Sequence, residues 1–205
     1  MRTTFHRKSP VLLAVAAAGL LATACGSGEG AVEPTEQVTP EPHSLSHDGT
    51  LAVPGKATDG FTYDTKLAPV GTEMAIDMRS FKGKSTFGLK VSGLLPNRGY
   101  AAHAHTENCG SNGDIAGPHF QHKPVPKNAS DTDPKYANPN NEIWLDLRTD
   151  AKGNGSSEAK LPFAITDWSR PKSVVVHAAK KTSTAPGMAG EAGDRIACLT
   201  LPHTH

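Results

Sequence analysis

The stretch TEMAIDMR at residues 72–79, followed after a short break by STFGLKVS at 85–92, decides the fold class. Apolar and polar side chains alternate in both segments, a period of two that is typical of a β-strand with one buried face. Six further segments have strand character, with β-branched or aromatic residues and boundaries of Gly, Pro or Asn. These segments are 61–67, 99–105, 142–148, 156–161, 173–177 and 195–201.

Turn signals separate these segments, among them PNRG at 96–99 and DAKGNG at 150–155. No convincing amphipathic helix lies between them. Eight short strands of this kind predict an all-β protein, built as an antiparallel sandwich or barrel. The connections 106–141 and 178–194 are too long for simple hairpins, and loops of this length in a compact β domain are usually functional or disordered.

The composition agrees with a loop-rich β protein. Among 205 residues, 37% are hydrophobic and 5% aromatic, with 20 Gly and 16 Pro, which argues against a helical bundle. The formal net charge is +1, so no broad basic field would recruit nucleic acid. After the N-terminal segment, no apolar run is long enough to span a bilayer.

Residues 1–24 have the organisation of a signal peptide. Arg2, Arg7 and Lys8 precede the apolar stretch 11–21, and small residues then lead to Cys25. This junction resembles a bacterial lipobox, although Ala22 stands where Leu is usual. We expect Cys25 to be lipidated, which would make the protein an exported lipoprotein on the extracytoplasmic face of the cell membrane. Ordinary cleavage beside a free Cys is the alternative.

Residues 25–57 are expected to form a flexible tether, because they are rich in Gly, Pro and polar residues. The folded domain is predicted over residues 58–205. Removal of residues 1–24 would leave 18 basic against 20 acidic residues, a net charge of −2.

The histidines supply the candidate chemistry. His103 and His105 lie in a predicted strand, where a period of two places both imidazoles on one face, roughly 7 Å apart. Such a pair can bind one metal ion or can simply lie on a solvated surface. Five others of the ten are set aside as belonging to the termini or the tether: His6, His43, His47, His203 and His205.

Two further histidines strengthen the metal hypothesis. His119 lies in the turn GPHF after the His103–His105 strand, and His177 ends the apolar strand SVVVH. Four imidazoles from three places would suit Cu, Zn, Fe or Ni. Spacing alone does not show that the four side chains converge.

The order of these motifs resembles the Cu/Zn superoxide dismutase family. The resemblance covers residues 60–202 and rests on AHAH at 102–105, Cys109, GPHF at 117–120, VH at 176–177 and GEAGDRIAC at 190–198. The last block is the most specific. The resemblance implies an eight-stranded Greek-key β-barrel or sandwich of the Cu/Zn superoxide dismutase type.

Residue roles follow from this resemblance. His103, His105 and His177 match three copper ligands, and His119 matches the fourth, which bridges copper and zinc in zinc-containing members. Arg195 matches the arginine that attracts superoxide beside the copper. Cys109 and Cys198 match the family's disulfide, which would close a loop of about 90 residues and contribute on the order of 4–5 kcal/mol.

The zinc site of the family is not matched. Residues 120–141 contain one histidine, His122, and NPNNEI at 138–143 stands where the last zinc His and Asp would fall. A site of His122, Asp131 and Asp133 is the alternative, but exposed loop acids are the favoured interpretation. The pattern resembles the copper-only branch of the family, so we expect copper without zinc.

Without zinc, one ring nitrogen of His119 needs another partner. Glu142, at the start of the apolar strand EIWLDL, is the candidate, and a strand-edge Glu facing water is the alternative. Trp144 is expected in the core.

The expected function is dismutation of superoxide, a small-molecule substrate, with His119, Glu142 and Arg195 in catalytic roles. The alternatives are a copper-binding or copper-delivery protein and a surface interaction domain. Arg195 argues against the first and the intact histidine set against the second. The sequence gives no indication of the oligomeric state.

Overall fold

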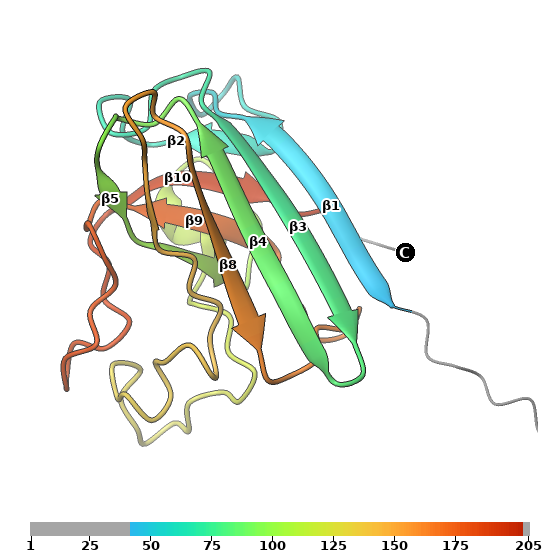
Figure 1. Ribbon diagram of the computed structural model, residues 1–205. Coiled ribbons are helices and arrows are strands. Elements are labelled where there is room, and N and C mark those ends of the chain that lie inside the picture. The colour runs from blue at the N-terminus through green and yellow to red at the C-terminus, as the bar shows by residue number, and fades with distance from the viewer. Residues whose placement is uncertain (1–41, 203–205) are drawn as a thin grey trace, which may run out of the picture. The chain divides into compact units, whose positions relative to one another are not determined.

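The computed structural model describes residues 42–202, which form an all-β fold. Two four-stranded antiparallel sheets make two layers (Figure 1). The first layer has the order β1 (His43–Thr50), β3 (Glu73–Phe81), β4 (Lys84–Ser92), β8 (Gly155–Leu161). The second has the order β2 (Gly60–Thr62), β10 (Arg195–Thr200), β9 (Ser173–His177), β6 (Ala102–His105). A two-stranded ribbon joins β5 (Gly99–Tyr100) to β7 (Leu147–Arg148), and a 3₁₀ turn, η1, covers Gly113–Ala116.

The alternation seen in the sequence builds the first layer. Every second side chain of β3 and β4 is buried, and the intervening ones face solvent. The second layer is covered on both sides, so β9 is buried along its whole length. Each fully buried aliphatic side chain contributes roughly 1.5–3 kcal/mol to stability. The core between the layers includes Ile76, Leu89, Val174, Val176 and Leu199.

The connections cross between the layers. β8 pairs with β4 in the first layer, although β5, β6 and β7 intervene along the chain and lie outside that layer. Such a return of a later strand to an earlier partner is the Greek-key pattern. The predicted antiparallel all-β class with Greek-key connections is therefore confirmed.

Two predicted strands are shorter than expected. The 61–67 strand ends at Thr62, because the Asp64 carboxylate accepts hydrogen bonds from the amides of Lys66 (2.8 Å) and Leu67 (3.1 Å), which turns the chain. In the 142–148 stretch only β7 is a strand. Its earlier part pairs through isolated bridges from Glu142 to Gln121 and from Trp144 to His103.

The predicted tether to residue 57 is wrong in its last part. Residues 43–50 form β1, which pairs along its whole length with β3 at the edge of the first layer. The sequence HSLSHDGT hides this strand because only Leu45 is fully buried in it. Backbone pairing and a 3.0 Å bond from His47 Nε2 to Asp59 Oδ2 hold it, so His43 and His47 belong to the fold.

Several predictions concern residues that the structure does not describe. The signal peptide 1–24, the lipidation of Cys25, the remaining tether to residue 41, and the tail residues His203 and His205 lie outside residues 42–202. Among the described residues, no helix reaches the length and hydrophobicity that crossing a membrane requires.

Candidate metal centre

The structure brings His103, His105, His119 and His177 together. One ring nitrogen from each lies within 4.8 Å of those from the others. β6 and β9 are paired neighbours in the second layer, and they supply His103, His105 and His177. The chain after β6 turns back and pairs with that strand, where the Phe120 amide donates to the Ala104 carbonyl at 2.9 Å. This pairing places His119 beside His105.

Backbone carbonyls fix the tautomers of two of the rings. His105 Nδ1 donates to the Gly117 carbonyl at 2.9 Å, and His177 Nδ1 donates to the Gly193 carbonyl at 3.2 Å. Both glycines have positive φ, 71° and 74°, so each position favours glycine. The Nε2 atoms of His105 and His177 then carry lone pairs only 3.4 Å apart. Two lone pairs at this distance repel unless a cation lies beside them.

A third ring is oriented through a hydroxyl. Thr182 donates from Oγ1 to Asp146 Oδ1 at 2.6 Å, and its amide donates to Asp146 Oδ2 at 2.8 Å. Thr182 Oγ1 must therefore accept from His103 Nε2, at 2.7 Å. The other nitrogen, His103 Nδ1, is buried and has no hydrogen-bond partner within residues 42–202. A buried acceptor without a partner is costly, and a bound metal ion would satisfy it.

Glu142 lies beside the fourth ring. Its Oε2 is 3.0 Å from His119 Nδ1 and accepts from Trp144 Nε1 at 2.7 Å, while Oε1 accepts from Gln121 Nε2 at 2.8 Å. The residue is 1% exposed, so the alternative of a water-facing glutamate is wrong. These donors compensate the buried carboxylate and leave His119 Nε2 for the metal.

Three of the imidazoles, those of His103, His105 and His177, remain neutral at physiological pH. Burial lowers the pKa of His103 and of His105 well below the ordinary value, and the neighbouring histidines lower both further. Burial also lowers the pKa of His177 to about 3. Neutral rings with free lone pairs are ligands for a metal ion, so the residues fit a metal of the imidazole-binding class.

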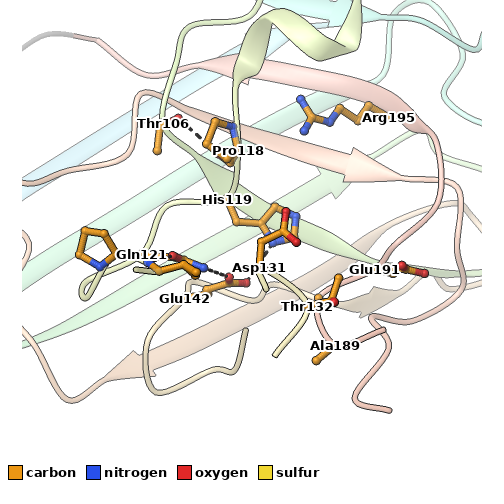
Figure 2. A pocket seen from close by; sticks show the side chains of 13 residues that line it. Thr106, Pro118, His119, Gln121, Asp131, Thr132, Glu142, Ala189, Glu191 and Arg195 are labelled. Carbon is orange, nitrogen blue, oxygen red and sulfur yellow. Dashed lines mark hydrogen bonds and ion pairs between the residues drawn. The ribbon is translucent and has the colours of Figure 1, made fainter. Parts of the chain in front are cut away.

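A pocket of about 530 Å³ opens beside the histidines, lined by His119, Glu142 and Arg195 (Figure 2). The His119 side chain is 19% exposed, so this ring reaches the pocket. Figure 2 shows Arg195 and Glu142 on opposite sides of His119. Burial lowers the pKa of Arg195, nearby Asp114 opposes that shift, and the guanidinium stays charged. A small anion that enters the pocket would therefore lie close to the fixed positive charge of Arg195.

The Cys109–Cys198 disulfide is present and supports Arg195 indirectly. It joins the loop after β6 to β10, and the Cys109 amide donates to Thr200 Oγ1 at 3.1 Å. The same loop continues to Gly113, whose carbonyl accepts from Arg195 Nη1 at 2.9 Å. The disulfide therefore fixes the segment that orients the guanidinium.

The alternative zinc residues are not brought together. The His122 ring stacks on Phe163 with centroids 4.5 Å apart, and the Asp133 carboxylate accepts from the Lys135 amide at 2.9 Å. Asp131 lines the pocket beside His119. Within residues 42–202, the four histidines are the single group of three or more His, Cys, Asp and Glu residues close enough to share a metal ion.

Sequence reasoning missed four residues of the site: Gln121, Trp144, Asp146 and Thr182. A signal for two of them was available. Residues 142, 144 and 146 alternate with the buried Ile143, Leu145 and Leu147, so Trp144 and Asp146 share a face with Glu142. Trp144 therefore contacts the Glu142 carboxylate and is not simply a core residue. No comparable pattern marks Thr182.

Comparison with known proteins relates the fold to solved structures. No protein-family model matches the chain, and no curated protein sequence matches it. The structure of the Cu/Zn superoxide dismutase from Brucella abortus is similar, with a TM-score of 0.50 and 16% sequence identity. The match covers 79% of this chain and all of the Brucella protein. The chain therefore has the fold of the Cu/Zn superoxide dismutases, as the sequence motifs predicted.

Proposed function

We propose that this protein is a copper-dependent superoxide dismutase that works outside the cytoplasm without zinc. One observation carries the proposal. Four imidazoles present one nitrogen each within 4.8 Å of one another, and a hydrogen bond fixes the second nitrogen of each ring. The similar fold of a Cu/Zn superoxide dismutase supports it.

The donor set favours copper and a single metal ion. Imidazole ligands suit both oxidation states of copper, and all four candidate ligands are imidazoles. A second metal would need His119 Nδ1, but this nitrogen is engaged with Glu142 at 3.0 Å. Glu142 in turn is held by Gln121 and Trp144, so it is fixed in that position.

Copper would supply the electron transfer of the reaction. A first superoxide would give up one electron and leave as oxygen. A second superoxide would receive that electron, take up two protons and leave as hydrogen peroxide. Arg195 would attract the anion and orient it through its two-pronged guanidinium. Whenever Nε2 is not bound to copper, His119 would carry a proton for the peroxide product on that nitrogen, while the Glu142 carboxylate at Nδ1 holds the ring in position.

The test is metal analysis combined with a dismutation assay. Protein loaded with both ions and washed with chelator should retain about one copper per chain and little zinc, and should accelerate superoxide decay in a pulse-radiolysis measurement. His119→Ala should abolish this rate, whereas His122→Ala, a histidine outside the cluster, should leave it unchanged. Stoichiometric, tightly held zinc would contradict the copper-only site. Copper binding without turnover would point to the copper-binding or copper-delivery alternative.

The exported location is part of the proposal. A disulfide is rare in the cytosol and persists in oxidising compartments, which supports export. Wild-type protein should partition with membranes and carry lipid mass on Cys25, and Cys25→Ser should accumulate unprocessed or be released. A cut after Ala24 with no lipid mass in a soluble protein would contradict lipidation.

A further inference from the structure

Trp168 projects from a tight turn into solvent. Its side chain is 99% exposed, although tryptophan is normally buried for much of its surface. The turn is closed by two backbone hydrogen bonds between Thr166 and Ser169, at 3.2 and 3.1 Å. This pairing places Trp168 at the tip of the turn. A large ring presented in this way contributes nothing to the core and is available for contact with a partner.

This turn lies at the end of the molecule where the described chain begins. Asp167 Oδ1 is 3.4 Å from His43 Nε2, and His43 opens β1. β1 starts opposite Ser80, the neighbour of Phe81, which ends β3 and is 42% exposed. In Figure 1 the β3–β4 turn and the start of β1 lie at the same end of the first layer. Two exposed aromatic side chains therefore share this end.

Basic side chains lie at the same end of the first layer as Phe81. We call these residues, together with Phe81 and Trp168, the basic end, and its cations come from β3, the β3–β4 turn, the start of β4 and the last part of β8. Lys82 Nζ lies 5.1 Å from the centroid of the Phe81 ring. Asp167, in the turn itself, is paired with His43. All six members are exposed: Arg79, Phe81, Lys82, Lys84, Lys160 and Trp168.

We propose that the basic end lies against an anionic lipid bilayer. Trp has an apolar body and one N–H donor, so it is enriched where hydrocarbon meets headgroups, and Lys and Arg are attracted to anionic headgroups. The chain enters the fold at this end, 18 residues after Cys25. A segment of that length spans at most about 65 Å even when fully extended, so a lipid on Cys25 would keep this end within reach of the membrane.

Tryptophan fluorescence tests the contact directly, because Trp144 and Trp168 are the two tryptophans of the chain. Processed, exported protein is combined with vesicles of phosphatidylglycerol and phosphatidylcholine. The emission of Trp168 is obtained by subtracting the emission spectrum of Trp168→Phe from that of the wild-type protein. We expect this signal to shift to shorter wavelength by roughly 10 nm and to be quenched by brominated lipids, because the ring enters the interface.

Charge variants separate this contact from tethering alone. The double change Lys82→Glu and Lys84→Glu should restore the solvent-exposed emission of Trp168, whereas Lys152→Glu, at the opposite end of β8, should not. Vesicles of phosphatidylcholine alone should give a smaller shift. Unchanged emission with anionic vesicles would overturn the proposal. So would a shift that appears without vesicles and grows with protein concentration, since that would indicate contact with a second copy of the chain.

Discussion

The two layers of the sandwich differ in what holds them together. In β3 and β4 of the first layer, buried apolar residues alternate with exposed polar ones, and the register is set by the interface with the second layer. The second layer is buried on both sides, and at one end apolar contacts give way to four histidines with hydrogen-bonded partners. The first layer is a scaffold that stabilises the fold, and the second carries the candidate chemistry.

The largest expected effect is the pH dependence of stability in the metal-free protein. Because the pKa of His103, His105 and His177 is lowered in the folded state, the unfolded chain takes up protons first as the pH falls. The free energy of unfolding should have its full value above about pH 6.5 and should fall as the pH drops below that value. The contribution of His177 should continue to fall until about pH 3. Each histidine should contribute a slope of up to about 1.4 kcal/mol per pH unit.

Urea unfolding of metal-free protein between pH 7 and pH 4 measures this slope. His177→Gln should reduce the slope of the unfolding free energy with pH. His122→Gln should not, because the His122 ring lies outside the cluster, stacked on Phe163. A stability that does not change over this range would show that the cluster is not buried and neutral as described.

Leu89→Ala should separate the scaffold from the site. Leu89 is fully buried on β4 in the first layer, and its truncation should lower the free energy of unfolding by about 2–5 kcal/mol. Copper stoichiometry and the dismutation rate of the folded fraction should stay close to wild type, because none of the four histidines lies on β4. Loss of copper without loss of stability would contradict the division between the layers.

Glu142→Gln should lower the dismutation rate by roughly tenfold while copper stays bound. The carboxylate accepts hydrogen bonds at both oxygens, so an amide places an NH₂ group against the donors of Gln121 or of His119 and Trp144. Gln121 cannot reverse its amide without losing its 3.1 Å bond from Val125. The change should also alter the ligand-field spectrum, and Glu158→Gln, on β8, is the matched control. An unchanged rate and spectrum would exclude Glu142 from the positioning of His119.

Arg195→Ala should lower the rate about as much as Glu142→Gln does, by roughly tenfold, but with an unchanged copper site. Its guanidinium lies in the pocket and makes its hydrogen bond to the Gly113 carbonyl. The dependence of the rate on ionic strength should weaken, because an exposed positive charge that attracts an anion is screened by salt. A full rate with the same salt dependence would show that Arg195 does not guide superoxide, and the copper-binding alternative would then lead.

The all-β class, most of the strands and the four candidate histidine ligands could be predicted from the sequence alone, since alternation and ligand-type side chains are local properties. Their convergence is a tertiary property, because it depends on the pairing of β6 with β9 and on the return of the chain to β6. The same holds for Thr182 and Asp146, which lie 79 and 43 residues from His103. β1 was not predicted because it is a polar edge strand. Backbone hydrogen bonds to β3 hold it in place, and such bonds leave no pattern in the side chains of β1.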